Sequence, residues 1–184
     1  CKNKWLVMRL IYFLFFMIFL SCKNDPLMVN NLFNHENYPL EVIKNSKLIH
    51  TEDGKIKLEV NSSKIERFSG DEPKLIFTDG FKVIFYNTSG KITSNLTANS
   101  AIVDEKKNIM TATDSVTLKN NERKLETETL IWDENNDKIY TDSDVIITTS
   151  NEIIYAQGFI SDPNFSDYTL KKISGKMFLN SPNN

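Results

Sequence analysis

Apolar and polar residues alternate along most of the chain from about residue 47 onward. In the segment 55–60 the alternation places Ile56, Leu58 and Val60 on one face, as in a half-buried β-strand. Similar short runs follow to the C-terminal end, at 63–68, 74–78, 81–86, 91–103, 108–113, 115–119, 124–132, 138–141, 144–149, 152–160 and 168–179.

Turn-forming sequences separate these runs. Asp53-Gly54, Asp79-Gly80 and Ser89-Gly90 have the composition of tight hairpins, and the segments 104–107, 120–121 and 135–137 are rich in Asn, Asp and Lys. No segment in this region sustains a helical period. The pattern therefore predicts an all-β domain, either an antiparallel sandwich, a jelly roll or an open barrel.

The chain contains an internal repeat with a period near 30 residues. The segment 96–105 aligns with 125–134 at an offset of 29, and 109–114 aligns with 139–144. A weaker copy of the turn lies at 78–83. Units of this size cannot bury an apolar face alone and must stack. The repeat predicts an elongated stack of hairpins and not a compact globule with a closed pocket.

The first 22 residues have a different composition. Lys2, Lys4 and Arg9 precede an unbroken apolar run at 10–20. As a helix, this run spans about 16 Å, roughly half of the ~30 Å hydrocarbon core, which is typical of a signal peptide.

The sequence Leu20-Ser21-Cys22 resembles a bacterial lipobox, although Phe19 is an imperfect fit to it. We therefore expect Cys22 to carry a lipid anchor. The alternative is an uncleaved anchor helix extended backwards through Leu6, and both alternatives predict a domain tethered to a membrane outside the cytoplasm. The expected organisation is a signal peptide or anchor at 1–22, an Asn-rich tether at 23–45 and a β-jelly-roll domain at 46–180.

Composition narrows the possible functions. The chain has 22 Lys and Arg residues against 24 Asp and Glu, a net charge of −2, which argues against nucleic-acid binding. Both cysteines lie within the first 22 residues, so the body has neither a disulfide framework nor a thiolate metal site. No catalytic motif stands out. We expect a non-enzyme without metal or cofactor.

Five segments in order are similar to the lipopolysaccharide-export C family (LptC-like), and most to its lipoprotein form from Bacteroidetes-type bacteria. They lie within a resemblance that runs from about residue 38 to 176, at 76–87, 96–101, 125–133, 139–142 and 158–162. The family often has Gly-x-Gly near its last strands, whereas Ala156-Gln157-Gly158 keeps only the second glycine.

This resemblance implies a twisted, V-shaped antiparallel jelly roll with an apolar interior. It also implies a function, in which the domain receives lipopolysaccharide from an inner-membrane ABC transporter and passes it to a soluble bridge protein of the same fold. The implied location is the periplasmic face of the inner membrane. The sequence alone also allows the outer membrane as an alternative location.

An open jelly roll would line its groove with the apolar residues that alternate in phase. The candidates for lipid contact are Phe77, Phe81, Val83, Phe85, Leu96, Ile102, Val116, Leu125, Ile131, Val145, Ile147, Tyr155 and Phe159. Apolar residues also occupy the opposite phase, at Ile76, Ile84, Val103, Leu130 and Trp132. The same candidates would equally form a closed core, in an envelope lipoprotein used for adhesion or scaffolding.

The outermost strands are candidates for partner binding, because an unpaired strand edge can accept a strand from a neighbour. We expect the strands at 47–60 to face the transporter and the strand at 168–179 to face the bridge protein. On that last strand the candidates are Tyr168, Leu170 and Ile173. The lysines beside them also suit the alternative, in which they prevent unwanted strand pairing.

Overall fold

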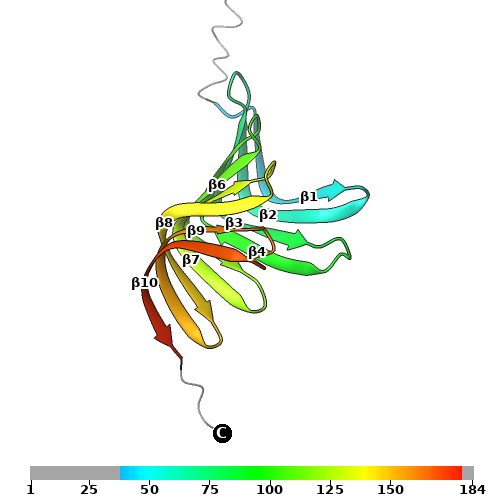
Figure 1. Ribbon diagram of the computed structural model, residues 1–184. Helices are drawn as coiled ribbons and strands as arrows, with labels where there is room; N and C mark the ends of the chain where they lie inside the picture. The colour runs from blue at the N-terminus through cyan, green and yellow to red at the C-terminus, as the bar shows by residue number, and fades with distance from the viewer. Residues whose placement is uncertain (1–37, 180–184) are drawn as a thin grey trace, which may run out of the picture. The chain divides into compact units, whose positions relative to one another are not determined.

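The computed structural model describes residues 38–179, which form one antiparallel β-sheet (Figure 1). Its ten strands are β1 (Glu41–Glu52), β2 (Lys55–Phe68), β3 (Lys74–Tyr86), β4 (Ile92–Ala98), β5 (Ser100–Asp104), β6 (Ile109–Lys119), β7 (Arg123–Asp133), β8 (Lys138–Thr149), β9 (Glu152–Ser161) and β10 (Tyr168–Phe178). No helix among these residues is long and apolar enough to span a membrane. The all-β prediction is confirmed.

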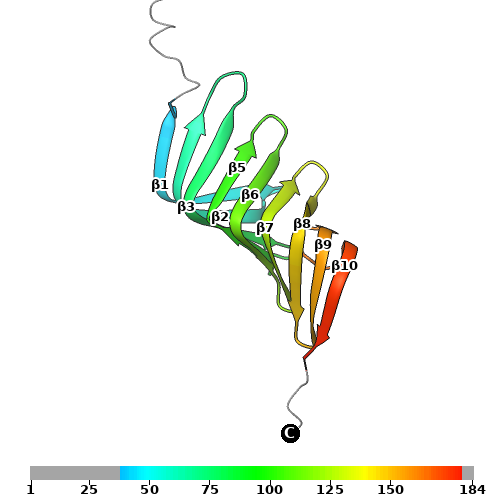
Figure 2. The same cartoon turned by 90° about the vertical axis from the view of Figure 1, so that its left-hand side faces the viewer.

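The strands follow one another across the sheet in chain order, so that β1 and β10 lie at its two ends (Figure 2). The short strands β4 and β5 act as the two halves of one interrupted strand, because both pair with β3 on one side and with β6 on the other. The sheet is thus a meander in which every connection is a local turn.

Most strands bend near the middle, and the bends lie next to one another. The backbone N–H of Gly80 in β3 donates to the carbonyl of Asn99, between β4 and β5, at 3.0 Å, and the N–H of Asn99 donates to the carbonyl of Asp114 in β6 at 3.0 Å. Register shifts mark the bends of three further strands, at 62–64 in β2, 127–131 in β7 and 141–144 in β8. Extra residues of this kind bend a strand sharply. Together the bends form a continuous corner across the sheet.

The corner folds the sheet so that its two halves face each other. We call the halves arm I, which comprises 64–68, 74–79, 100–104, 109–113, 129–133, 138–142, 158–161 and 168–172, and arm II, which comprises 55–62, 80–86, 92–98, 116–119, 123–127, 144–149, 152–157 and 173–178. The ring of Phe85 in arm II packs edge-on against Trp132 in arm I, at 5.3 Å between centroids. The arms thus form the two layers of the expected jelly roll.

The repeated turns stack at the free end of arm I. Asp104 and Asp133 stand at equivalent repeat positions, and each accepts hydrogen bonds from backbone N–H groups of its own turn. The two turns also touch, because the side-chain amide of Asn135 donates to the carbonyl of Lys107 at 2.8 Å. The predicted stacking of hairpin units is therefore seen directly.

Three local expectations need correction. Asp79-Gly80 is not a hairpin but the corner of β3, and its positive φ angles of 62° and 91° turn the strand without ending it. Several predicted short strands merge into longer bent ones, so that 108–113 and 115–119 become β6. Strand β1 begins at Glu41, inside the segment expected to be a tether. Cys22 and the leader at 1–22 lie outside the described residues.

Gly158 provides a test of the corner. Its φ is +78°, and a Cβ placed there would stand 2.7 Å from Cδ and 3.0 Å from Cβ of Lys171 in β10. Gly80 has a comparable φ of +91° with nothing within 4 Å of such a Cβ. Gly80→Ala should therefore lower the free energy of unfolding by about 1–2 kcal/mol for the backbone conformation alone. Gly158→Ala should cost roughly 1–3 kcal/mol more for the overlap.

Denaturant unfolding of the full-length variants measures this difference. Equal destabilisation by the two alanines would mean that the close approach of β9 and β10 at the corner relaxes freely.

Candidate lipid-binding groove

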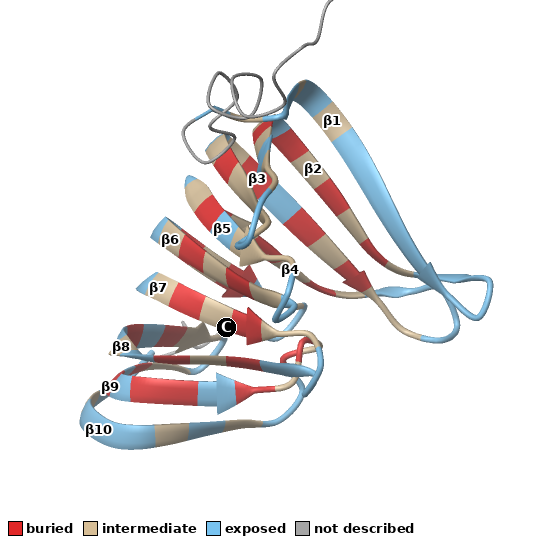
Figure 3. Ribbon diagram, turned by 90° about the horizontal axis from the view of Figure 1, so that it is seen from above, coloured by how far each residue is buried: buried red, intermediate tan, exposed pale blue. Residues whose placement is uncertain are grey.

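The space between the arms is filled by apolar side chains. Ten of the groove candidates lie there, each no more than 5% exposed: Phe77, Phe81, Val83, Phe85, Leu96, Val116, Leu125, Val145, Ile147 and Phe159. Figure 3 shows that buried bands alternate with exposed or half-buried ones along most of the strands. The place of these ten residues in the interior is established, whereas their contact with lipid stays a prediction.

The other three groove candidates point away from the interior. Ile102 is 50% exposed and lies in a row with Ile131 on the outer face, both across from Thr111 of β6. Tyr155 is 39% exposed and is paired with the exposed Ile146. The corner is the physical reason for the error, because its bulges reverse the inward phase along a strand. In β7 the inward residues after the bulge are Leu130 and Trp132.

The apolar interior continues to both ends of the sheet. Within residues 38–179, β1 and β10 each pair with one strand only. Leu48 in β1 stands opposite the buried Val60 and is 38% exposed, whereas Ile173 in β10 stands opposite the buried Ala156 and is 63% exposed. The other two partner-edge candidates, Tyr168 and Leu170, pack against the core. Both outermost strands therefore present apolar side chains in register with the interior.

The hairpins at the free end of arm II, together with Asn164, enclose an opening that we call the mouth. A cavity of about 360 Å³ there is lined by Glu52, Asp53, Lys55, Ile56, Lys57, Tyr86, Asn87, Thr88 and Asn164. The ammonium of Lys57 lies 3.1 Å from the carboxylate of Glu52; the hydrogen bond between them raises the pKa of Lys57, although burial opposes this.

A smaller cavity of about 70 Å³ shares Lys57, Tyr86 and Asn164 with this one and reaches Leu58, Phe85 and Trp132. The mouth thus passes from a polar rim to an apolar floor.

Trp132, on the floor of the mouth, has an unsatisfied donor. Its indole Nε1 is buried and has no hydrogen-bond partner among the described residues. The pattern of alternation identified Trp132 only as an apolar residue in the opposite phase. Its position at the mouth depends on the reversal of phase at the corner of β7.

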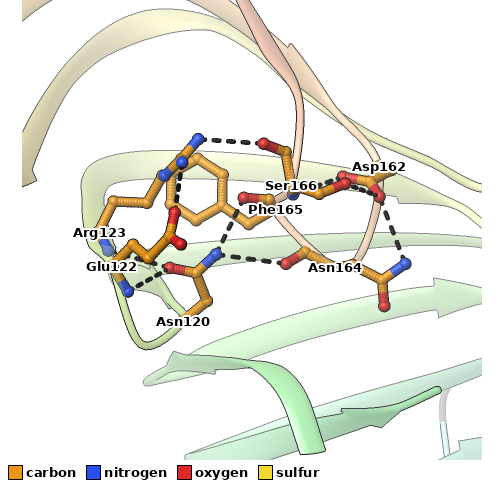
Figure 4. Close-up of polar contacts among 7 residues, drawn as sticks. All are labelled: Asn120, Glu122, Arg123, Asp162, Asn164, Phe165 and Ser166. Carbon is orange, nitrogen blue, oxygen red and sulfur yellow. Dashed lines mark hydrogen bonds and ion pairs between the residues drawn. The ribbon is translucent and has the colours of Figure 1, made fainter.

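A loop from arm I crosses to arm II beside the mouth. We call this loop, residues 162–167 between β9 and β10, the strap. The hydroxyl of Ser94 donates to the carbonyl of Pro163, and the side-chain amide of Asn120 donates to the carbonyl of Phe165 at 3.0 Å. Arg123 donates to the carbonyl of Ser166 at 3.1 Å (Figure 4). Two side chains of arm II, and that of Asn120 in the turn between β6 and β7 at its end, therefore hold the strap through its backbone carbonyl groups.

The strap is ordered internally by Asp162. The carboxylate of Asp162 accepts hydrogen bonds from the backbone N–H of Ser166 at 2.9 Å, from its hydroxyl at 2.7 Å and from the amide of Asn164 at 3.3 Å. Burial raises the pKa of Asp162, but these hydrogen bonds outweigh burial and hold the pKa below its usual range. The strap is therefore organised around an ionised carboxylate.

Phe165, at the centre of the strap, points into the interior. Its side chain is fully buried, and its ring packs edge-on against Phe159 at 5.5 Å and Tyr168 at 5.7 Å. The guanidinium of Arg123 lies 5.7 Å from the Phe165 ring and 5.3 Å from that of Tyr168. None of the strap residues was a site candidate in the sequence, although Asp162 belongs to the segment 158–162 that resembles the family.

Ionisable side chains do not assemble into a metal site in this part of the chain. Among residues 38–179, no group of three or more His, Cys, Asp or Glu side chains could hold a metal ion.

Comparisons with known proteins identify the family. The family model described as lipopolysaccharide-assembly, LptC-related, matches residues 10–172. Among solved structures, the chain is similar to LptH, the LptA-homologous periplasmic component of the lipopolysaccharide transport device from Pseudomonas aeruginosa. The sequence identity is 10%, the alignment covers 79% of this chain and 97% of that chain, and the TM-score is 0.40. No curated protein matches the sequence. Because the family model spans most of its length, the chain belongs to the LptC-related family of lipopolysaccharide-assembly proteins.

Proposed function

We propose that this protein is the membrane-tethered periplasmic component of a lipopolysaccharide export bridge. In this role it receives lipopolysaccharide from an inner-membrane ABC transporter and passes it to a soluble jelly-roll bridge protein. The observation that carries the proposal is the apolar interior between the arms, which extends to the exposed Leu48 at one end of the sheet and Ile173 at the other. Membership of the LptC-related family supports the same role.

The apolar interior would keep the acyl chains of a lipid out of water while the lipid crosses the periplasm. Exposing one acyl chain of about a dozen carbons to water costs on the order of 10 kcal/mol. Alternate residues of each strand point between the arms, so every strand from β2 to β9 contributes apolar side chains to the lining. A chain that moves along this lining keeps apolar contacts throughout.

The mouth suits the other part of an amphiphile. Its rim carries Lys55, Lys57, Asn87 and Thr88, whereas its floor reaches the apolar core at Phe85. A lipid with its acyl chains between the arms would therefore have its polar portion at the rim, in contact with water. Transfer of this kind makes and breaks no covalent bond, so it requires no catalytic residue.

The two outermost strands suit the partners. Each has one edge without a partner strand among residues 38–179, so another jelly roll could extend the sheet and continue the lining. In the proposed orientation β1 faces the transporter and β10 faces the bridge protein. The tether to the inner membrane would be supplied by lipid on Cys22 or by an anchor helix in the same segment.

Photo-crosslinking in living cells tests the lipid path. A light-activated residue in place of Phe85 or Leu125, which are buried between the arms, should form adducts with lipid A. The same residue in place of Tyr155 or Ile102, on the outer face, should not.

Adducts at the outer positions alone would place the lipid outside the groove. A folded, tethered protein without adducts at any position would instead favour the adhesion or scaffolding alternative.

A substitution at the exposed end of the interior tests partner binding. Ile173→Asp places a charge where we expect the lining of the next jelly roll, and it should strongly reduce co-purification of the soluble bridge protein. Ile102→Asp is the matched control, because Ile102 is 50% exposed and lies on the outer face. Both replaced side chains are exposed, so the thermal unfolding temperature of both variants should change little. Equal co-purification of the partner by the two variants would contradict the proposed orientation.

A further inference from the structure

The strap combines three features that a simple connecting loop does not require. It inserts a large aromatic ring between the arms, it holds a bulky residue in a strained backbone conformation, and it is attached to arm II by side chains alone. Each feature bears on whether the strap stays in place when a lipid enters.

The ring of Phe165 occupies space in the interior itself. Phe165 is fully buried and belongs to the same apolar cluster as Leu125 and Phe159. An acyl chain that passed between the arms at this level would meet the Phe165 ring. The position of the ring is thus an apolar site that the protein fills with its own loop.

The closed position of the strap carries costs. Phe165 has a φ of +55°, a conformation that a bulky residue rarely adopts and that persists only where surrounding contacts enforce it. Pro163 and Asn164 line the small cavity beside Trp132, whose buried Nε1 lacks an acceptor. Backbone strain and an unpaired donor both disfavour this arrangement, so the burial of the Phe165 ring and the hydrogen bonds to arm II must together outweigh them.

The hydrogen bonds from arm II to the strap are few and reversible. Each hydrogen bond from arm II to the strap comes from the side chain of Ser94, Asn120 or Arg123, and each ends on a carbonyl of the strap. Such bonds can be exchanged for bonds to water when the strap moves. Strands β9 and β10 pair with each other over their length, so the strap can move while the sheet stays intact.

We infer that the strap is a displaceable plug, whose Phe165 ring occupies an acyl-chain site until lipid A replaces it. This inference rests on the proposed function, because it concerns the same groove. With the strap displaced, the mouth widens and the N–H of Trp132 becomes available to an acceptor oxygen, such as an acyl carbonyl of the lipid. Lipid binding and strap closure then compete for one site, so whatever weakens closure strengthens binding.

Asn120→Asp weakens closure selectively. The Asn120 side-chain oxygen accepts hydrogen bonds from the backbone N–H groups of Glu122 and Arg123 at 2.9 Å, and aspartate keeps this acceptor. The substitution removes only the amide that donates to the strap, and it places a carboxylate oxygen near the Phe165 carbonyl.

Asn135→Asp is the matched control. Asn135 also accepts a hydrogen bond through its oxygen and donates from its amide to a turn carbonyl, that of Lys107 at 2.8 Å, away from the strap.

The experiment uses the full-length protein in living cells, with a light-activated residue in place of Leu125. If the strap is a plug, Asn120→Asp should increase lipid A adducts several-fold over the protein that keeps Asn120 and Asn135, and Asn135→Asp should not. Equal yields in all three would overturn the plug, and a lower yield in Asn120→Asp would show a lid that retains lipid. Absence of lipid adducts in all three proteins would contradict the proposed function, and the plug would be rejected together with it.

Hydrogen exchange of the purified full-length protein provides a measurement of the strap itself. Asn120→Asp should accelerate exchange of the Phe165 and Ser166 amides, which are bonded to Asp162, while exchange in β3 stays unchanged. Addition of lipid A should produce the same acceleration in the unsubstituted protein. Lipid adducts without any such acceleration would mean that lipid passes the strap in place, and the plug would be rejected while the lipid path stands.

Discussion

The structure depends on the corner that crosses the sheet. A meander of long strands without bends would leave one apolar face in water, and no helix among residues 38–179 is available to cover it. The bends solve this problem within the sheet, because each strand supplies residues to both arms and the arms bury each other. The requirement is that all bends lie side by side, and backbone hydrogen bonds through Gly80, Asn99 and Asp114 provide this alignment.

The same corner explains which parts of the structure the sequence predicted. Alternation predicted the strands, their antiparallel order and most of the interior, because period two survives within each arm. It failed where the phase reverses. Tyr155 and Phe159 are four positions apart and were assigned to one face, yet the bend at Gly158 places Tyr155 outside and Phe159 inside. A bulge depends on pairing with neighbouring strands, so the pattern along one strand does not predict it.

Turn chemistry shows the same limit. Asp53-Gly54 and Asp79-Gly80 have the same composition and both residues of each pair have positive φ, yet one pair is a hairpin and the other a corner. The local conformation was predictable, but its effect on the chain was not. After Asp53-Gly54 the chain turns back and pairs with the strand that it has just left, whereas after Asp79-Gly80 it continues to pair with β2. The strap was not predicted for a related reason, since its contacts join residues 40 or more positions apart.

The stacked turns of Asp104 and Asp133 have a consequence for the size of the domain. Each repeat of about 30 residues supplies two bent strands, and the turns of adjacent repeats touch each other. Strands in a sheet are spaced by about 4.8 Å, so one repeat adds roughly 10 Å to the sheet. A gene that gained or lost one repeat would change the length of the domain in steps of that size and leave its cross-section unchanged. The distance that such a domain spans is therefore counted in whole repeats.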